Sequence, residues 1–426
     1  MPNLDPRKLI LDSFISALNS LDPATVMEKH SRRLSPLNDE EKVAVIGFGK
    51  ASYRMFEGFK KGYSGTVEQA AIIIPDDQKV RDPPDGLEIL RGSHPCPTQI
   101  SLNSSRRILD IINNTKDIPV IFLISGGASS LFEIPVDGIS IEDLASITKQ
   151  IMNNGANIYQ LNAVRQALSL VKGGKLVRFL RGRRIYSFMI SDVPEDRQDI
   201  IASGPLSPSN TTKNEVWHIL RKFLKESDLT AENLMKLANF DFPQRNEFSM
   251  VTSRIVLKND HFVRHISSMI RNMGYRVISI GSGIAGDVSE VAKSLNSLAL
   301  SISKMYNNDF FIVGGGETTS TVQGNGKGGR NQELVIRVFR MGKCHIDTFM
   351  SAGTDGIDGN SSYAGGIATA AEFKKIDPDD VEKALKNSDS SSFLERHGMV
   401  IDTGPTGNNV SDVFTAFVRG GKKREA

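Results

Sequence analysis

Short apolar segments alternate with segments of helical periodicity along much of the chain. Residues 43–46, 70–75 and 119–124 are compact apolar runs, whereas 100–112 repeats apolar positions at helical spacing. Such runs predict buried strands, and their alternation with helices predicts a parallel sheet covered on both faces. Each run is followed by a turn, and ligands of parallel sheets bind beyond the carboxyl ends of the strands.

The alternation stops once and then resumes, which predicts two domains. Periodicity is lost across 240–250, a segment with one proline and three charged residues. Apolar runs at 252–256 and 310–313 then restart the pattern. A chain of 426 residues also favours two domains, at about 100–200 residues each. We therefore expect a first domain at 1–245 and a second, smaller α/β domain at 246–426.

Composition and charge exclude several classes of protein. The hydrophobic content of 39% and the charged content of 24% are ordinary for a globular protein. The net charge of +3 is the small difference between 52 basic and 49 acidic residues, which are dispersed rather than gathered in a basic stripe. No apolar run approaches the roughly 20 residues of a membrane span, and the N-terminus lacks the apolar segment of an export signal.

The number and spacing of the cysteines indicate a reducing compartment. Cys96 and Cys344 lie far apart and form no CxxC pair, which excludes a disulfide framework and a cysteine-rich zinc site. We expect a cytoplasmic protein that binds a small molecule and neither nucleic acid nor a membrane.

The first candidate for chemistry is the turn after the first predicted strand. Gly47 and Gly49 would let a phosphate approach the backbone amides at the start of a helix, and Lys50 would add a positive charge. The dinucleotide fingerprint fails, because Ser52 occupies the position of its third glycine. A tight turn with a solvated lysine is the alternative.

A second candidate is a run of small residues after the strand at 119–124. Successive amides there could form an anion-binding nest, with hydroxyl groups as extra donors. A plain glycine-rich turn is the alternative. The residues are Ser125, Gly126, Gly127, Ala128 and Ser129.

Two further polar groups follow along the chain. Asn162 and Arg165 share one face of a predicted helix, and Lys172 comes soon after it, so this face could bind an anion or simply be solvated. Asp192 follows the strand expected at 185–190, where a carboxylate could hold a metal or accept a proton from a hydroxyl group. An Asx turn before the proline is the alternative for Asp192.

The segment 314–329 contains seven glycines in sixteen residues. Glycine at this density destabilises regular structure but suits a backbone that wraps a phosphate chain. Arg330 would then bind the negatively charged phosphate through its planar guanidinium. The segment is not a P-loop, because Gly328 stands where Ser or Thr is required and Thr321 where a glycine is required. A flexible exposed hairpin is the alternative.

A last glycine-rich stretch, 351–359, carries two carboxylates. Asp355 and Asp358 could hold Mg²⁺, which prefers carboxylates together with substrate phosphates. A turn with solvated aspartates is the alternative.

Taken together and in order, these motifs resemble the class II glycerate kinases, the MOFRL family. The resemblance extends over roughly residues 5–418 and is carried by the segments GFGKA, SGGASSL, NAVRQALSLVKGGKL, SDVPEDRQDIIASGP, GGETTSTVQGNGKGGRNQE, SAGTDGIDG and TGPTGNNVSD.

The resemblance implies a Rossmann-like first domain, a smaller α/β second domain and a cleft between them. It further implies phosphorylation of D-glycerate by ATP with Mg²⁺ or another divalent cation, commonly at the 2-hydroxyl group to give 2-phosphoglycerate, in a monomer or homodimer. Lys50 and Arg330 match the lysine and arginine that the family uses at the reaction centre.

On this basis Lys50 and Arg330 are assigned to the γ-phosphoryl group and Asp192 to the hydroxyl proton. Glu317 and Asp355 are the expected metal ligands. The nests at 125–129 and 326–329 would hold the substrate carboxylate and the nucleotide phosphates, in either order. The residues expected to bind substrate or nucleotide are Gly47, Gly49, Ser125, Gly126, Gly127, Ala128, Ser129, Asn162, Arg165, Lys172, Gly315, Glu317, Gly328, Gly329 and Asn331.

The sequence departs from the family pattern at three places. Phe48 replaces a small residue between the two glycines, and 195–197 reads Glu-Asp-Arg where Gly-Asp is usual. Ser362 and Tyr363 stand where an acid and an alanine are expected, which weakens a metal role for that loop.

Two other functions remain open from the sequence. An oxidoreductase that acts on hydroxypyruvate would need the dinucleotide fingerprint that Ser52 interrupts. A non-catalytic sensor of sugar acids or nucleotides would bind its ligand without releasing ADP.

Overall fold

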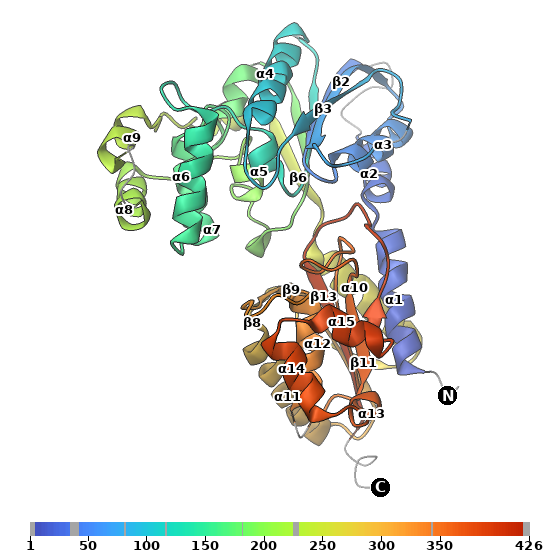
Figure 1. Cartoon of the computed structure of the whole chain (residues 1–426). Helices are drawn as coiled ribbons and strands as arrows, with labels where there is room; N and C mark the ends of the chain where they lie inside the picture. The colour runs from blue at the N-terminus through green and yellow to red at the C-terminus, as the bar shows by residue number, and fades with distance from the viewer. Residues whose placement is uncertain are drawn as a thin grey trace. The chain divides into compact units, whose positions relative to one another are not determined.

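The computed structural model describes residues 5–34, 42–80, 82–115, 117–180, 182–224, 230–341 and 344–420 (Figure 1). The chain divides into two compact units. The first unit is Pro23–Val256, and the second combines the residues up to Asp22 with those from Leu257 onward. The second unit is therefore discontinuous in sequence.

The first unit contains a six-stranded sheet with the strand order β3-β2-β1-β4-β5-β6. Strands β1 to β5 pair in parallel, as the alternating pattern predicted. The strands are β1 (Lys42–Phe48), β2 (Thr66–Pro75), β3 (Leu87–Gly92), β4 (Val120–Ile124), β5 (Ile185–Ile190) and β6 (Val251–Leu257).

Helices cover both faces of this sheet, α4 on one and α3 with α2 on the other. The helices are α2 (Pro23–Ser31), α3 (Ser52–Gly62), α4 (Gln99–Asn114), α5 (Ala128–Leu131), α6 (Ile141–Asn153), α7 (Ile158–Ala167), α8 (Lys213–Phe223) and α9 (Ala231–Leu237). Short 3₁₀ turns lie at η1 (Lys175–Leu180), η2 (Pro194–Asp196), η3 (Ile201–Ser203) and η4 (Arg245–Phe248).

The second unit contains a mixed seven-stranded sheet with the order β12-β11-β10-β13-β9-β7, and β8 pairs with β9. Its central strands are antiparallel, whereas β7 and β8 each run parallel to β9. The strands are β7 (Arg276–Ser279), β8 (Ile284–Asp287), β9 (Phe310–Thr319), β10 (Thr348–Gly353), β11 (Gly365–Thr369), β12 (Val400–Ile401) and β13 (Asp412–Val418).

Helices α11 and α12 pack on one face of the second sheet, and α1 and α10 on the other. The helices are α1 (Pro6–Ser20), α10 (Asn259–Asn272), α11 (Val288–Met305), α12 (Arg330–Arg340), α13 (Ala370–Phe373), α14 (Pro378–Lys386) and α15 (Ser390–Arg396). The expected α/β class, with a parallel sheet in the first unit, is confirmed.

The division of the chain differs from the expected boundary at 245/246 in two respects. Strand β6, expected to open the second domain, pairs with β5 and completes the first sheet. Helix α1, expected in the first domain, packs on α10 in the second unit, because its apolar stripe (Leu9, Ile10, Phe14) is buried there. Periodicity shows that a helix has an apolar face but not which partner covers that face.

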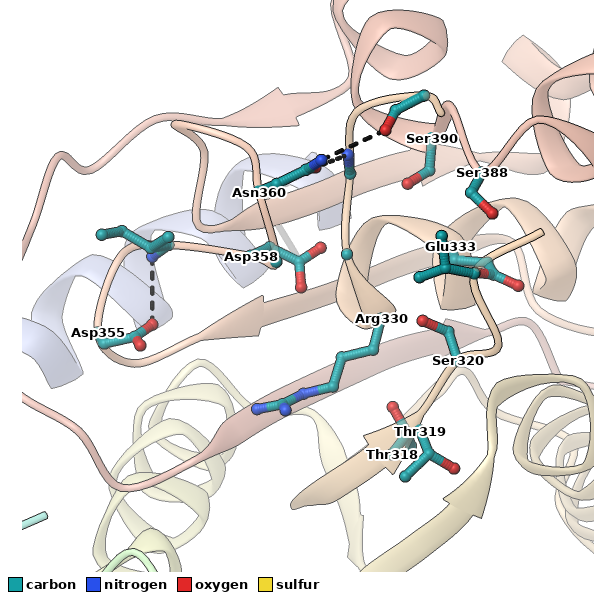
Figure 2. A pocket seen from close by; sticks show the side chains of 16 residues that line it. Thr318, Thr319, Ser320, Arg330, Glu333, Asp355, Asp358, Asn360, Ser388 and Ser390 are labelled. Atoms are coloured by element: carbon teal, nitrogen blue, oxygen red, sulfur yellow. Dashed lines mark hydrogen bonds between the residues drawn. The ribbon is translucent and has the colours of Figure 1, made fainter. Parts of the chain in front are cut away.

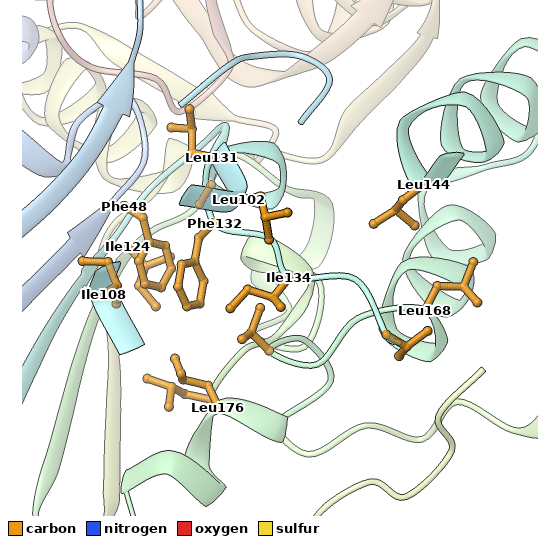
Figure 3. Packing of buried hydrophobic residues seen from close by; sticks show 14 of the residues in the cluster. Phe48, Leu102, Ile108, Ile124, Leu131, Phe132, Ile134, Leu144, Leu168 and Leu176 are labelled. Atoms are coloured by element: carbon orange, nitrogen blue, oxygen red, sulfur yellow. The ribbon is translucent and has the colours of Figure 1, made fainter. Parts of the chain in front are cut away.

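Phe48, the large residue between Gly47 and Gly49, lies in the core of the first unit (Figure 3). Its ring stacks on Phe132 with centroids 4.6 Å apart and planes 11° from parallel. It also meets the edge of Phe122, with centroids 6.2 Å apart. The unusual residue of this turn is therefore a packing element that joins β1 to the segment after α5.

We expect Phe48→Ala to destabilise the first unit by about 3–5 kcal/mol, because it removes a fully buried ring and leaves a cavity. Phe179→Ala is the matched control, since that ring is 38% exposed and should cost far less. Urea denaturation followed by circular dichroism measures both. Equal shifts of the unfolding midpoint in the two variants would contradict the core assignment.

Candidate active site

The carboxyl ends of the parallel strands bring several predicted residues to one edge of the first sheet. Lys50 follows β1, the segment 125–127 follows β4, and Asp192 follows β5. A pocket of about 270 Å³ lies at this edge. Residues that line it include Gly126, Gly127, Ala128, Ser129, Asn162, Arg165 and Asp192.

The turns after β1 and β4 are locked together through Ser125. Its Oγ accepts a hydrogen bond from the amide of Ala51 at 2.9 Å, and the amide of Lys50 donates to the carbonyl oxygen of Gly126 at 2.9 Å. Gly49 has a φ of +130°, and a Cβ there would lie 2.6 Å from the carbonyl oxygen of Ser125 and closer still to its Oγ. Gly49 and Ser125, expected to bind a ligand, thus have a packing role in this structure.

Gly47 has the same kind of role. A Cβ at this position would lie 2.6 Å from Cγ2 of Ile72 on the neighbouring strand β2. Ser52 holds the turn from the other side, because its Oγ donates to the carbonyl oxygen of Gly49 at 2.7 Å.

The amides of Gly126 and Gly127 accord with the nest hypothesis. Within the described part of the chain, neither amide donates to a protein acceptor. Gly127 has a φ of +82°, and Lys50 and His94 pack beside it: a Cβ at Gly127 would lie 3.4 Å from Cγ of Lys50 and 3.1 Å from Cδ2 of His94.

His94 lines the same pocket and was not predicted from the sequence. Partial burial and the nearby charges of Lys50 and Arg165 lower the pKa of His94 to about 4, although Asp77 acts in the opposite direction. The imidazole is therefore neutral near pH 7, and it can donate or accept a hydrogen bond. His94 follows β3, which ends two residues earlier at Gly92. This strand was not predicted, and recognising it would have placed His94 at the same edge of the sheet.

Asn162 and Arg165, predicted to share a helical face, both reach this pocket from α7. Asn162 is 2% exposed, and its Oδ1 accepts a hydrogen bond from Ser203 Oγ at 2.5 Å. Ser203 also contacts Ser129, with 3.0 Å between the two Oγ atoms. Burial lowers the pKa of Arg165, while Glu133 raises it. This face is therefore not simply solvated.

Lys172, also expected to bind a ligand, lies beneath the loop instead of in the pocket. It is 1% exposed, and its Nζ donates to the carbonyl oxygens of Ser129 at 2.7 Å and Phe132 at 3.0 Å. Its Nζ also lies 3.3 Å from a carboxylate oxygen of the buried Glu133. Lys172 therefore positions the loop that carries Ser129, and sequence analysis could not find its partner Glu133, which lies 39 positions away by numbering.

A second pocket, of about 570 Å³, belongs to the other unit (Figure 2). The end of β9, the start of α12 and the loop after β10 form its walls. Gly328, Gly329, Arg330 and Asp355 from the predicted site line it. Figure 2 also shows Asp358 and Glu333 among the side chains around it.

The glycine-rich loop before α12 is anchored by its own amides, contrary to the expected nest at 326–329. The amide of Gly326 donates to the carbonyl oxygen of Asn387 at 2.9 Å, and that of Gly328 to Asn360 Oδ1 at 2.7 Å. The amide of Lys327 donates to Asp389 at 3.1 Å. Three of the four amides are thus occupied by protein acceptors, and an anion could not bind them without breaking these bonds.

Arg330 is held between two carboxylates. Its Nε and Nη2 donate to the two oxygens of Asp412 at 2.6 and 3.1 Å, and its Nη1 donates to Glu317 at 2.7 Å. Burial opposes the charge, but the hydrogen bonds and charge of Asp412, with Glu317, raise the pKa of Arg330. Arg330 is thus a fixed cation, Glu317 is committed to it, and Asp412 is a site residue that the sequence analysis missed.

Asn331 and Gly315, expected to bind substrate or nucleotide, have structural roles and do not line the pocket. Asn331 donates from Nδ2 to Asp358 at 3.2 Å and accepts from Ser351 Oγ at 2.6 Å. A Cβ at Gly315 would collide with the side-chain oxygen of Asn259.

Asp358 caps the start of α12 from a neighbouring loop. Its two oxygens accept from the amides of Asn331 at 3.1 Å and Gln332 at 2.8 Å. Burial raises the pKa of Asp358 to about 7, while these hydrogen bonds act in the opposite direction. This capping orients the helix from which Arg330 projects.

Of the two expected metal ligands, Asp355 lines the pocket, and its Oδ1 accepts from the amide of Ile357 at 3.1 Å. Glu317 pairs with Arg330 instead. Among the residues that the structure describes, no group of three or more His, Cys, Asp or Glu side chains is arranged to hold a metal ion.

Comparison with known proteins identifies the family. Residues 9–237 match a domain of unknown function, DUF4147, and residues 310–412 match the MOFRL family. A glycerate 2-kinase from Picrophilus torridus is 39% identical over 413 residues, which cover 96% of each chain. The chain belongs to the glycerate 2-kinase family.

The fold also matches that of a solved glycerate kinase. The crystal structure of a glycerate kinase from Thermotoga maritima matches with a TM-score of 0.83 and 27% identity over 97% of this chain and 99% of that one. A putative hydroxypyruvate reductase from Agrobacterium vitis is 28% identical over 88% of this chain and 99% of its own length. In the described part of this glycerate 2-kinase family member, no helix is long and apolar enough to cross a membrane.

We expect Gly49→Ala to lower the thermal unfolding midpoint more than Gly155→Ala does. Both glycines have a positive φ, +130° and +91°, but the space around Gly155 is open, whereas Gly49 abuts Ser125. The control therefore reports backbone strain alone, and the clash should add about 1–3 kcal/mol at Gly49. Calorimetry or circular dichroism measures both, and equal midpoints would show that the two turns are not interlocked.

Proposed function

We propose that the protein transfers the γ-phosphoryl group of ATP to D-glycerate, at the 2-hydroxyl group, and so forms 2-phosphoglycerate and ADP. The observation that carries this proposal is the relationship to a glycerate 2-kinase over 96% of both chains, which includes both units. The protein is thus a phosphotransferase with an alcohol group as the acceptor.

Phosphoryl transfer requires mainly that donor and acceptor are positioned and that charge on the transferred group is neutralised. Lys50 suits this role, because its Nζ makes no hydrogen bond or ion pair within the described residues and it stands beside Gly127 at the pocket. Arg330 suits it differently, as a cation whose charge and orientation are fixed by Asp412 and Glu317. We assign both to the transferred phosphoryl group.

Asp192 is the proposed acceptor of the hydroxyl proton. It follows β5 and lines the pocket of about 270 Å³ together with His94. A carboxylate that accepts a hydrogen bond from the attacking hydroxyl group orients the oxygen lone pair toward phosphorus. His94, neutral near pH 7, offers a second hydrogen-bonding partner there.

Mg²⁺ fits the second pocket only in part. Asp355 can supply one oxygen ligand there, whereas Glu317 is already paired with Arg330. One protein carboxylate is compatible with Mg²⁺, because this ion keeps several waters and takes further ligands from substrate phosphates. When bound, Mg²⁺ would neutralise charge on the nucleotide phosphates. We therefore propose Asp355 as the metal ligand and no longer Glu317.

The oxidoreductase alternative is less well supported. A dinucleotide fingerprint needs a third glycine where this chain has Ser52, which is fully buried and donates to the backbone of Gly49. A non-catalytic sensor would leave the unpaired ammonium group of Lys50, within the described residues, and the fixed charge of Arg330 without a chemical role.

Incubation with ATP, Mg²⁺ and D-glycerate, followed by ³¹P NMR, tests the reaction and its position together. We expect ADP and 2-phosphoglycerate. Oxidation of NADH by hydroxypyruvate with no ATP requirement would favour the reductase instead, and ligand binding without ADP release would favour the sensor.

We expect Lys50→Ala and Arg330→Ala each to lower kcat by about 10²–10³-fold, by analogy with the loss of one preorganised donor to transition-state charge. Lys79→Ala, on the exposed surface of the same unit as Lys50, is the control and should retain normal turnover. Steady-state ADP release measures all three. Near-normal turnover in either active-site variant would remove that residue from the mechanism.

Asp412→Asn should lower kcat by about 10-fold while the KM for glycerate stays nearly constant. The change removes the charge that holds Arg330 through two hydrogen bonds but leaves the guanidinium in place. Thermal unfolding checks that the variant is folded. Unchanged kcat in a folded variant would show that Asp412 does not position Arg330 for the reaction.

A further inference from the structure

Buried charges beneath the pocket of the first unit do not balance. Glu133 is one anion, and it interacts with three cations, Lys172, Lys175 and Arg165. The carboxylate of Glu133 is already engaged: Oε1 accepts from Ser169 Oγ at 2.5 Å and from the amide of Ile134 at 3.0 Å, and Oε2 pairs with Lys172 at 3.3 Å. Lys172 and Lys175 also donate to backbone carbonyl oxygens, so Arg165 is the cation of this group that lacks such partners in the described part of the chain.

The guanidinium of Arg165 also lacks hydrogen-bond acceptors among the residues that the structure describes. Across the described ranges, its guanidinium donates to no protein acceptor, and the side chain lines the pocket of about 270 Å³. Burial lowers its pKa, which is the effect of removing water from a cation without supplying an anion in full. A desolvated guanidinium without a hydrogen-bonded anion favours the binding of an anionic ligand.

Asn162 provides a second, independent observation. It is 2% exposed and lines the same pocket, and its Nδ2 is buried without a hydrogen-bond partner among the described residues. Its Oδ1 is held by Ser203 at 2.5 Å, which fixes the amide plane. A buried donor without an acceptor costs about 1–3 kcal/mol, so an acceptor oxygen from a ligand would relieve this cost.

We propose that Arg165 and Asn162 Nδ2 bind the carboxylate of the acceptor substrate, so that the first-unit pocket is selective for short 2-hydroxy carboxylates. The assignment rests on the proposed kinase function and allots the acceptor to the smaller of the two pockets. Two carboxylate oxygens match one planar guanidinium and one amide donor.

Size and hydrogen-bonding groups favour the hydroxy acid over the nucleotide here. The volume of about 270 Å³ is less than half that of the pocket in the other unit, at about 570 Å³. Asp192 also lines the smaller pocket, together with Lys149 at its surface. The carboxylate of Asp192 can accept a hydrogen bond from the hydroxyl group of the acid.

Glu133 acts on this site through its neighbours as a positioning residue. It compensates Lys172, which holds the carbonyl oxygens of Ser129 and Phe132, and Ser129 contacts the hydroxyl group of Ser203 that fixes Asn162. The orientation of the proposed amide donor thus depends on a chain of contacts that begins at this buried carboxylate.

Isothermal titration of D-glycerate, alone and with a saturating non-hydrolysable ATP analogue, tests the proposal. We expect Arg165→Gln to weaken glycerate binding about 100-fold and Arg165→Lys about 10-fold. Asn162→Asp should also weaken it about 100-fold, because this isosteric change keeps the acceptor for Ser203 but replaces the donor by an anion. The affinity for ADP should change less than about 3-fold in these variants. Arg106 is an exposed arginine on α4, and Arg106→Gln should change the affinity for neither glycerate nor ADP.

Wild-type protein gives a test that does not depend on folding of a variant. Glyceramide and glycerol, which lack the carboxylate, should bind at least about 100-fold more weakly than D-glycerate. Glyceramide that binds as tightly as glycerate would overturn the proposal, as would an Arg165→Gln variant that loses ADP affinity and keeps glycerate affinity.

The two proposals fail separately. If Arg165→Gln binds and phosphorylates glycerate like the wild type, the carboxylate assignment is wrong and the kinase function stands. If glycerate binding depends on Arg165 but ATP is never consumed, the kinase function is wrong and the carboxylate site stands. No glycerate binding under either condition would overturn both.

Discussion

The contact between the turns after β1 and β4 determines the geometry of the first-unit pocket. These strands are neighbours in a parallel sheet, and Ser125 ties the two turns through its side chain and its backbone. Gly49 must lack a side chain for this contact to form. Gly126 and Gly127 then line the pocket with Lys50 packed beside Gly127, because the register of β1 against β4 is fixed.

Glycine has two distinct uses in this protein. After β4, two glycine amides remain available for a ligand, and the residues around them are held by side chains from elsewhere. Before α12, the glycines instead allow the backbone to approach 387–391 and 358–360 closely, and the amides are used in that contact. The same composition thus supports a binding surface in one unit and a rigid wall in the other.

The sequence predicted the strands β1, β2, β4 and β5 and the helix α4 from periodicity and apolar runs, because these signals are local. It also brought Asn162 and Arg165 to one helical face, as the structure has them. It could not predict that Arg330 pairs with Asp412, 82 positions away, or that Lys172 pairs with Glu133. Such pairs are determined by the tertiary fold. The same limit applies to the protein contacts of Lys172, Asn331 and Gly315, whose residue types suit ligands and packing equally well.

Helix α1 has a consequence for how the chain acquires its structure during synthesis. Its apolar face finds its partner α10 only after more than two hundred intervening residues have left the ribosome. Synthesis proceeds at about 5–20 residues per second, so the amphipathic segment remains uncovered for at least ten seconds or so. The first unit is continuous from Pro23 to Val256, so it can fold in that interval, before α10 is available to cover the apolar face of α1.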